Sequence, residues 1–149
     1  MFFKQPFLVW PPLPGLSGRR EDSVYSPMVM DHFSNPRNVG YIENPTVAVQ
    51  YGEPSCGDCL LIFLTIENNR LREMKYKVLG CAAAIATASM TSVMATGRTV
   101  EQALKLTEKE IAEALGGLPP DKMHCSNLAV GALKAALDVH LGRQQEQEV

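Results

Sequence analysis

The feature that most constrains the fold is a nearly unbroken apolar segment, LLIFLTI, at residues 60–66. Its length favours a strand, and its apolar character predicts that both faces of this strand are buried. Asn68-Asn69 marks a turn, and residues 74–78 then alternate apolar side chains with lysines, as a half-solvated strand does. Residues 46–52, TVAVQYG, form a third candidate strand. Because the connection after the central strand is short, we expect an antiparallel meander.

Capping residues and apolar spacing predict about five helices on this sheet. The first begins at Ser26-Pro27 and ends near Phe33. The second spans residues 81–95, whose small side chains favour close packing on the sheet. Two capping boxes and one apolar stripe mark the other three helices. Their starting points are Thr99 (with Gln102), Thr107 (with Glu110) and a position near Ser126.

Apolar stripes predict the buried faces of the two longest helices. In residues 81–95 the stripe is Ala82, Ile85, Ala86, Met90 and Val93, and in the last helix it is Val130, Leu133, Leu137 and Leu141. Between the helices, Gly116-Gly117 ends one element and LPPDK (118–122) is predicted to be an extended connector. The expected fold class is α+β, a small three-stranded antiparallel sheet with about five helices packed on it.

Composition excludes two broad classes of function. The chain of 149 residues is 46% hydrophobic and 20% charged, which predicts a globular domain. Its net charge is −2, whereas a nucleic-acid-binding domain normally carries a basic patch. No apolar run reaches the roughly 20 residues that a membrane span needs. We therefore expect neither nucleic acid nor membrane as a partner.

The N-terminal segment does not fit a secretory signal; an organellar presequence is the alternative, because residues 1–20 contain no acidic residue, although prolines would disrupt its helix. Residues 1–22 are apolar at first but contain several prolines, and the arginine pair follows the apolar part instead of preceding it. We interpret residues 1–22 as a dispensable extension, 23–142 as the folded domain and 143–149 as a frayed polar tail. Without an export signal the cysteines belong in a reducing compartment, and a cytoplasmic location is favoured over the mitochondrial matrix.

Residues with metal-binding side chains stand at three places that can meet at one end of the sheet. Cys56 and Asp58 precede the central strand, Cys81 lies between a strand and a helix, and His124-Cys125 precede the last helix. Helix N-termini favour negative charge, so we expect lowered thiol pKa values at Cys81 and Cys125. Gly57 and the glycine before Cys81 have no side chain, so we expect them to leave room for a bound metal or cluster. Thiolates suit iron–sulfur chemistry, while the hard oxygen of an aspartate would keep one iron exchangeable.

Two other functions are compatible with the same residues. A zinc protein could use a tetrahedral Cys₃Asp or Cys₃His set, either to fix its fold or as a resting form. A thiol–disulfide enzyme could use the CxxC pair Cys56 and Cys59, although no βαβ pattern surrounds it.

Five motifs together resemble the IscU/NifU N-terminal family of iron–sulfur cluster assembly scaffolds. The resemblance covers about residues 24–142. The matching segments are DHFSNPRNVG (31–40), PSCGD (54–58), GCAAAIA (80–86), LPPDK (118–122) and HCSNLA (124–129).

The resemblance implies an IscU/SufE-like fold and an assembly site made of Cys56, Asp58, Cys81, His124 and Cys125. Cys125 would accept persulfide sulfur from a cysteine desulfurase, and Asp58 would bind iron and keep the product labile. A ferredoxin-like donor would supply electrons for a transient 2Fe-2S cluster, which then passes to apo-proteins. The chain would be a carrier and not an enzyme, and one chain or a homodimer could hold the cluster.

Some positions separate this sequence from relatives of the same family. The 43 residues between Cys81 and Cys125, with His124 before the second cysteine, resemble the IscU branch and not the zinc-dependent SufU-like branch. Asp121 stands where the family's chaperone-recognition segment, LPPVK, has valine, which leaves docking of an Hsp70-type chaperone open. Val130-Gly131 replaces a common acidic pair, and Cys59 is an additional cysteine.

Several polar residues have simpler interpretations. We expect Cys59 to be a small buried residue at a strand start, with a fourth sulfur ligand or spare persulfide carrier as the alternative. His32 is interpreted as structural, and His140 as a residue that complements a helix dipole or meets solvent. Lys122 is either a surface lysine or, because it is close to His124 in sequence, part of the site.

Overall fold

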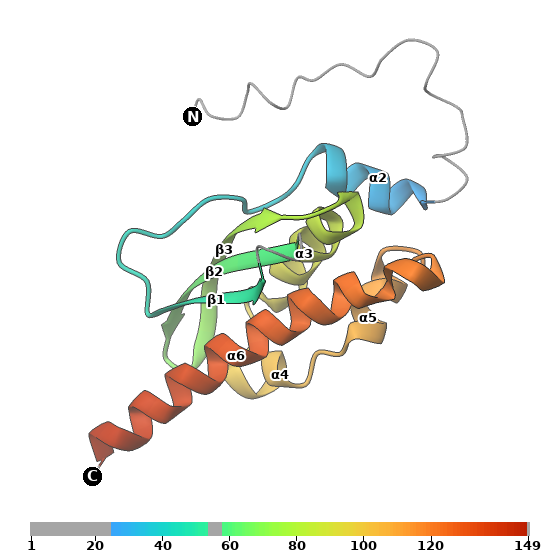
Figure 1. Cartoon of the computed structure of the whole chain (residues 1–149). Coiled ribbons are helices and arrows are strands. Elements are labelled where there is room, and N and C mark those ends of the chain that lie inside the picture. The colour runs from blue at the N-terminus through green and yellow to red at the C-terminus, as the bar shows by residue number, and fades with distance from the viewer. Residues whose placement is uncertain (1–24, 54–57, 149) are drawn as a thin grey trace.

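The computed structural model describes residues 25–53 and 58–148 (Figure 1). The expected N-terminal extension, residues 1–22, and the predicted ligand Cys56 lie outside the described residues.

Three strands form one antiparallel sheet in the order β1-β2-β3. They are Val47–Glu53 (β1), Asp58–Glu67 (β2) and Arg70–Leu79 (β3). In the turn between β2 and β3, Asn68 and Asn69 have φ angles of 54° and 60°. A two-residue hairpin loop of this kind needs two left-handed residues, which asparagine tolerates better than most side chains. The predicted meander is confirmed.

Burial of the central strand differs between its two faces. Leu60, Ile62 and Leu64 are fully buried, whereas Leu61 and Phe63 are half-buried. The prediction that both faces are buried is therefore wrong. The apolar side chains of the second face are only partly covered, with the ring of Tyr41 meeting that of Phe63 edge-on at a centroid distance of 6.4 Å.

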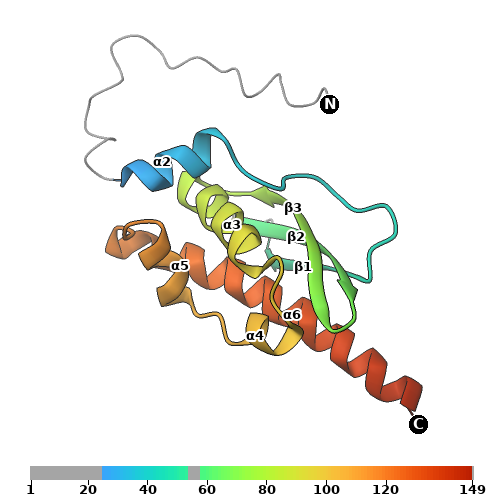
Figure 2. The ribbon, with the colours of Figure 1, turned by 180° about the vertical axis from the view of Figure 1, so that it is seen from behind.

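Five α-helices and one short 3₁₀ helix complete the described chain and confirm the α+β class. α3 and α6 pack on the sheet and on each other, α2 packs on α3, and α5 packs on α6 (Figures 1 and 2). The elements are α2 (Pro27–Ser34), α3 (Ala82–Ala95), α4 (Val100–Leu104), α5 (Glu108–Ala114), η4 (Pro120–Lys122) and α6 (Met123–Glu148).

Helix α3 is buried around most of its circumference. Sheet, α2, α5 and α6 all contact it, so its small side chains are covered on several sides. The predicted single stripe is wrong in part, because Val93 is 46% exposed while Ala83, Ala84 and Ala88 are buried. Some buried hydroxyls in α3 bond within the helix; Thr91, for example, donates to the Thr87 carbonyl oxygen at 2.7 Å.

The predicted caps are confirmed at three helices. The Ser26 hydroxyl accepts a hydrogen bond from the Val29 N–H at 3.0 Å, and Pro27 follows at the first helical position. Thr99 and Thr107 each form a complete capping box, with Gln102 and Glu110. The chain leaves α5 through Gly116 and Gly117, both with positive φ.

The approach to α6 differs from the prediction. Residues 120–122 form the 3₁₀ helix η4 instead of an extended connector, because Pro120 supplies a helical φ and the Lys122 N–H bonds to the Pro119 carbonyl at 2.8 Å. Helix α6 begins at Met123 instead of near Ser126, so His124 and Cys125 lie in its first turn. It continues to Glu148, whereas the sequence predicted a frayed tail; the final residues are good helix formers.

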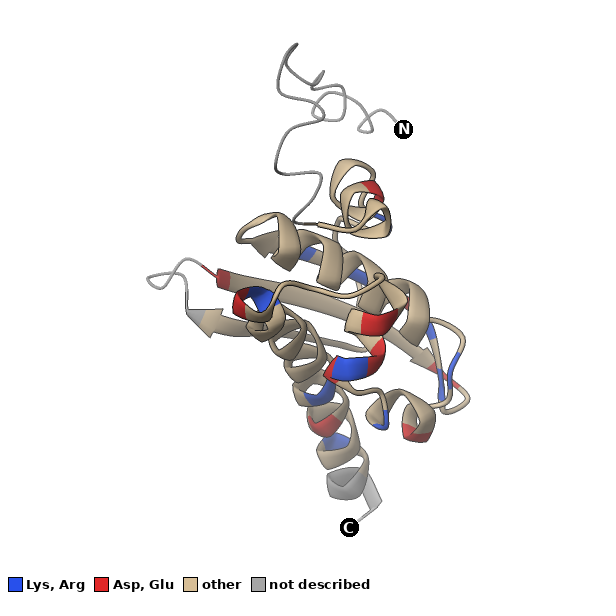
Figure 3. Ribbon diagram, turned by 90° about the vertical axis from the view of Figure 1, so that its right-hand side faces the viewer, with Lys and Arg blue, Asp and Glu red and all other residues tan. Residues whose placement is uncertain are grey.

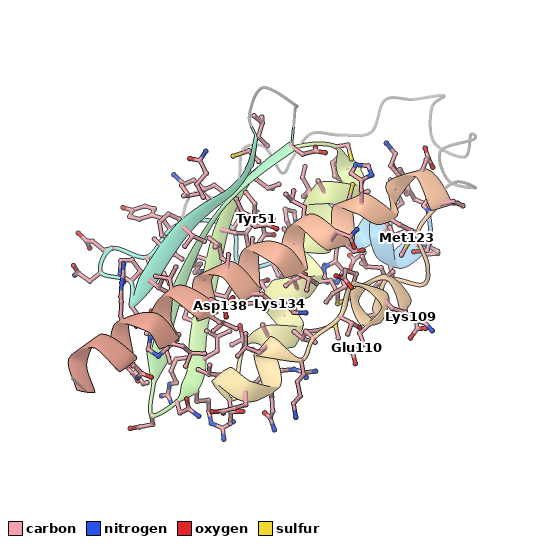
Figure 4. All side chains as sticks on the ribbon, turned by 60° about the horizontal axis from the view of Figure 1, so that its bottom comes forward. Tyr51, Lys109, Glu110, Met123, Lys134 and Asp138 are labelled. Atoms are coloured by element: carbon pink, nitrogen blue, oxygen red, sulfur yellow. The ribbon has the colours of Figure 1, made fainter. Side chains whose placement is uncertain are left out.

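The predicted stripe of α6 is confirmed for its central part. Val130, Leu133 and Leu137 are buried, and Leu141 is half-buried. Gly131 lies beside Tyr51 of β1, which Figure 4 labels. A Cβ at position 131 would lie 2.6 Å from the Tyr51 hydroxyl oxygen, so glycine allows this ring to pack against α6.

Two buried histidines have different surroundings. The Nδ1 atom of His32 lies 2.7 Å from the Ser89 hydroxyl, which confirms its structural role. His140 was expected to complement a helix dipole or meet solvent, but it is only 8% exposed, and its Nε2 has no hydrogen-bond partner among the described residues. Burial lowers the pKa of both histidines.

Basic and acidic positions are interspersed along the described ribbon (Figure 3). In the part of the chain that the structure describes, no helix is long and apolar enough to span a membrane.

We predict that Ser89→Ala destabilises the fold. Its hydroxyl bonds His32 and also accepts from the Arg37 N–H at 2.9 Å, so its removal leaves two buried or partly buried groups without a partner. The expected loss in the free energy of unfolding, measured with denaturant, is about 1–3 kcal/mol. Ser34→Ala, at an exposed position of α2, is the control and should change it by less than about 0.5 kcal/mol. Equal effects of the two substitutions would contradict this role of Ser89.

Candidate metal and sulfur site

Three segments that are distant in sequence meet at one end of the sheet. Asp58 begins β2 and lies opposite Glu53 of β1. Cys81 directly follows β3 and Gly80 and is the N-cap residue of α3. Cys125 lies in the first turn of α6, which is packed on α3 and on the sheet. The predicted convergence of these segments is therefore confirmed for the described residues.

Four of the predicted ligands form a continuous series of short contacts. The Sγ atoms of Cys81 and Cys125 are 3.8 Å apart, and the Cys125 Sγ lies 3.6 Å from His124 Nε2. His124 Nε2 in turn lies 3.5 Å from Asp58 Oδ2. Two thiols, one imidazole and one carboxylate thus share a single site, and the fifth predicted ligand, Cys56, lies outside the described residues.

Solvent exposure varies strongly across this site. Cys125 is 1% exposed and packs with Ala83 and Ala84 of α3, while Cys81 is half-buried. The side chains of Asp58 and His124 are 31% and 59% exposed. The sulfur end of the site is therefore enclosed by apolar side chains, and the oxygen and nitrogen end is more open to solvent.

The thiol of Cys125 is strongly disfavoured as a thiolate. Burial and the neighbouring Cys81 raise the pKa of Cys125 to about 12, with a smaller contribution from the Asp58 carboxylate. The expectation that a helix N-terminus would lower this pKa is wrong, because desolvation outweighs the helix dipole here. A cation bound between these groups would act in the opposite direction, since metal binding favours the deprotonated thiol.

Lys122 provides positive charge beside the thiols. The charge of Cys81, followed by that of Tyr25, raises the pKa of Lys122, and the Lys122 ammonium lowers the pKa of Cys125. Of the two interpretations for this residue, the structure favours a position next to the site over a plain surface lysine.

The absence of a side chain at Gly80 creates space for the Asp58 carboxylate. A Cβ at position 80 would lie 2.8 Å from Asp58 Oδ1 and 2.8 Å from the Ala84 Cβ. The clearance expected at this glycine is present, and the group that occupies it is the Asp58 side chain.

The donor atoms suit a metal, although they do not yet surround one point. Two thiolates bound to one tetrahedral metal at about 2.3 Å would lie ~3.8 Å apart, which fits the Cys81–Cys125 pair. However, no group of three or more His, Cys, Asp or Glu side chains within residues 25–53 and 58–148 is arranged to hold a metal ion. In the described part of the site, Cys81 and Cys125 are therefore spaced like two ligands of one metal ion. His124 and Asp58 lie next to this pair but do not surround the same point.

Cys59 does not belong to this series of contacts. Successive residues of a strand face opposite sides of the sheet, so Cys59 points away from the face that carries Asp58 and Leu60. It is half-buried, so the expectation of a fully buried residue is wrong. The other cysteine of the CxxC pair, Cys56, lies outside the described residues.

Sequence reasoning missed two residues that contact the site. Thr87 donates from Oγ1 to the Cys125 carbonyl oxygen at 3.2 Å, and its only sequence signal is a hydroxyl within an alanine-rich helix. Tyr25 packs beside Cys81 and Cys125, and burial raises its pKa. No local pattern marks Tyr25, because it reaches the site through the packing of α2 against α3.

Comparisons with known proteins identify the family of this chain. Residues 24–147 match the family model described as "NifU-like N terminal domain". The iron–sulfur cluster assembly scaffold protein IscU 1 of Archaeoglobus fulgidus is 54% identical over 114 residues, which cover 76% of this chain and 74% of that protein. The iron–sulfur cluster assembly scaffold protein IscU of Aquifex aeolicus is 43% identical over 126 residues, covering 83% and 80%.

One solved structure shows the same fold at low sequence identity. The N-terminal part of a nitrogen-fixing NifU-like protein from Brucella abortus superposes with a TM-score of 0.64 at 16% identity, covering 87% of this chain and 99% of that one. This likeness shows the fold alone.

We predict that Cys81→Ala lowers the pKa of Cys125, because the neighbouring Cys81 is the second largest cause of its increase. The pKa should stay above the ordinary thiol value, since burial remains. The measurement is the pH dependence of the Cys125 Cβ chemical shift in isotope-labelled, chelator-treated protein, which needs no access for a reagent. Cys59→Ala is the matched control and should leave the profile unchanged, because Cys59 faces the other side of the sheet. A shift of equal size in both variants would contradict the assignment.

Proposed function

This chain belongs to the NifU-like N-terminal domain family, and from that premise we propose that it is a scaffold on which an iron–sulfur cluster is assembled and then passed on. The observation that carries the proposal is the meeting of Cys81, Cys125, His124 and Asp58 at one end of the sheet. The cluster is the cargo of this site and not a resident cofactor.

The donor set supports loading followed by release. Cys81 and Cys125 supply the soft sulfur ligands that iron–sulfur clusters require, and Cys56 is proposed as a third. Asp58 supplies a hard oxygen at the solvent-facing end, where exchange with water is easiest. His124 lies between Cys125 and Asp58, so it can replace or complement either ligand. We propose a 2Fe-2S cluster as the product.

Sulfur would arrive through Cys125. Its thiolate attacks the terminal sulfur of a cysteine desulfurase persulfide, which forms a new S–S bond on Cys125 and releases the enzyme's thiolate. Each transferred sulfur then needs two electrons to become sulfide, and a ferredoxin-like donor is proposed to supply them. Because Cys125 is 1% exposed, its neighbourhood has to open before this attack. The Lys122 ammonium favours the attacking thiolate.

The finished cluster would pass to apo-proteins, which makes the chain a carrier without turnover of its own. We propose cytoplasmic action, with a homodimer as one way to share the cluster. Residues 118–122, which form η4 and its approach, are the proposed docking segment if a dedicated chaperone takes part; Asp121 is exposed there.

Zinc binding at the same site is the second candidate function. The 3.8 Å separation of the two thiols also fits one edge of a tetrahedral zinc site, and Asp58 or His124 could contribute a further ligand. If zinc removal abolishes all activity and prevents cluster assembly, the zinc role is favoured. If zinc removal permits assembly, zinc is a resting occupant.

The central prediction concerns assembly under anaerobic conditions. The full chain incubated with ferrous iron, cysteine, a cysteine desulfurase and a reductant should develop the visible absorption and acid-labile sulfide of a 2Fe-2S cluster. Cys125→Ser should lose both signals, because it removes the proposed sulfur acceptor and one ligand. Cys59→Ser should retain both, since Cys59 lies on the other face. Assembly by Cys125→Ser at the wild-type rate would rule out the proposed sulfur route.

A second prediction concerns the lability given by Asp58. Asp58→Ala should hold its cluster longer in the presence of a chelator and transfer it more slowly to an apo-ferredoxin. The physical reason is the loss of the solvent-facing oxygen ligand at which exchange would begin. Decay of the visible spectrum and appearance of the acceptor's spectrum give the two rates. Faster cluster loss in Asp58→Ala would contradict the role proposed for this carboxylate.

A further inference from the structure

The two thiols at the sulfur end of the site lie close together. The Sγ atoms of Cys81 and Cys125 are 3.8 Å apart, about 1.8 Å more than the length of a disulfide bond. Cys81 is the N-cap residue of α3, and its side chain makes no capping hydrogen bond, so no bond to the helix N-terminus has to break when its torsion changes. A change in side-chain torsion can therefore bring the sulfurs together.

The surrounding contacts keep the two backbones in register. Thr87 of α3 donates to the carbonyl oxygen of Cys125 at 3.2 Å, and Ala83 and Ala84 pack against Cys125. Because these alanine side chains are small, they do not hold the two thiols apart. Nothing comparable connects Cys59 to either thiol, because Cys59 lies on the opposite face of the sheet.

We propose that Cys81 and Cys125 are a modification site, where a peroxide converts the metal-free protein to a reversible intramolecular disulfide. Cys81 is half-buried and can meet a small oxidant, whereas Cys125 is 1% exposed and is shielded from it. Because their exposure is unequal, we assign Cys81 as the thiol that the peroxide oxidises first. Cys125 is then the thiol that attacks the oxidised sulfur and forms the disulfide.

The chemistry balances in two steps. The Cys81 sulfur attacks one oxygen of hydrogen peroxide, the O–O bond breaks, and the released hydroxide takes the proton that the Cys81 thiol loses to become water. Cys81 is now a sulfenic acid, oxidised by two electrons. The Cys125 sulfur then attacks the Cys81 sulfur, the S–S bond forms, the S–O bond breaks, and a second water leaves with the Cys125 proton. His124 Nε2, 3.6 Å from the Cys125 Sγ, is placed to relay that proton.

The disulfide would remove two sulfur ligands from the site until a dithiol reduces it. This consequence rests on the proposed function, but formation of the bond does not. It would also protect the buried thiols from further, irreversible oxidation when no metal occupies them.

The test uses the full chain, freed of metal with a chelator and treated with one equivalent of hydrogen peroxide. After blocking of the remaining thiols, peptide mass spectrometry should find residues 81 and 125 joined, and dithiothreitol should separate them. Cys59→Ser is the matched control and should form the same bond. Cys125→Ser should instead accumulate a Cys81 sulfenic acid that dimedone traps.

Three results would overturn the proposal. They are a disulfide that joins Cys56 or Cys59 in place of this pair, a Cys81 sulfenic acid that persists in the wild type, and no oxidation of Cys81 at all. Circular dichroism of Cys125→Ser checks that the variant is folded. Cluster assembly by the untreated protein is measured in parallel. If cluster assembly fails while the Cys81–Cys125 disulfide forms, the proposed function is wrong and the modification site stands. If cluster assembly succeeds and the disulfide does not form, the modification site is wrong and the proposed function stands.

Discussion

The hydrogen bond from Thr87 Oγ1 to the Cys125 carbonyl oxygen joins α3 to the first turn of α6 across 3.2 Å. This bond can form because alanines line this part of α3 and let the two helices approach closely. The same contact brings Cys125 to Cys81, and through His124 to Asp58. The site therefore depends on close packing between two helices that are far apart in sequence.

That packing also decides the chemistry of the thiols. Enclosure of Cys125 raises its pKa to about 12, so the free site holds a neutral, protected sulfur. Lys122 opposes this effect, and a bound cation would oppose it further. The Asp58 carboxylate, which is partly open to solvent, lies at the other end of the site. A site with buried sulfur ligands at one end and an oxygen ligand open to solvent at the other suits the proposed assembly and later release of an iron–sulfur cluster.

Local rules predicted the elements whose limits depend on their own residues. The hairpin at Asn68-Asn69, the caps at Ser26, Thr99 and Thr107, and the helix start after Cys81 follow from short-range geometry and hydrogen bonding. Predictions that needed knowledge of neighbouring elements were less successful. The second face of β2, the exposed Val93 and the buried His140 were wrong, because coverage by other elements decides burial.

The sequence by itself determined which donor groups exist and that each lies next to the end of a strand or the start of a helix. It also determined family membership, because five separate motifs match together. Only the tertiary structure decided that Cys81 and Cys125 lie 3.8 Å apart, that Cys125 is buried, and that Gly80 makes room for Asp58. These properties depend on the position of α6 relative to α3 and the sheet, which is set by packing between distant segments and not by any local pattern.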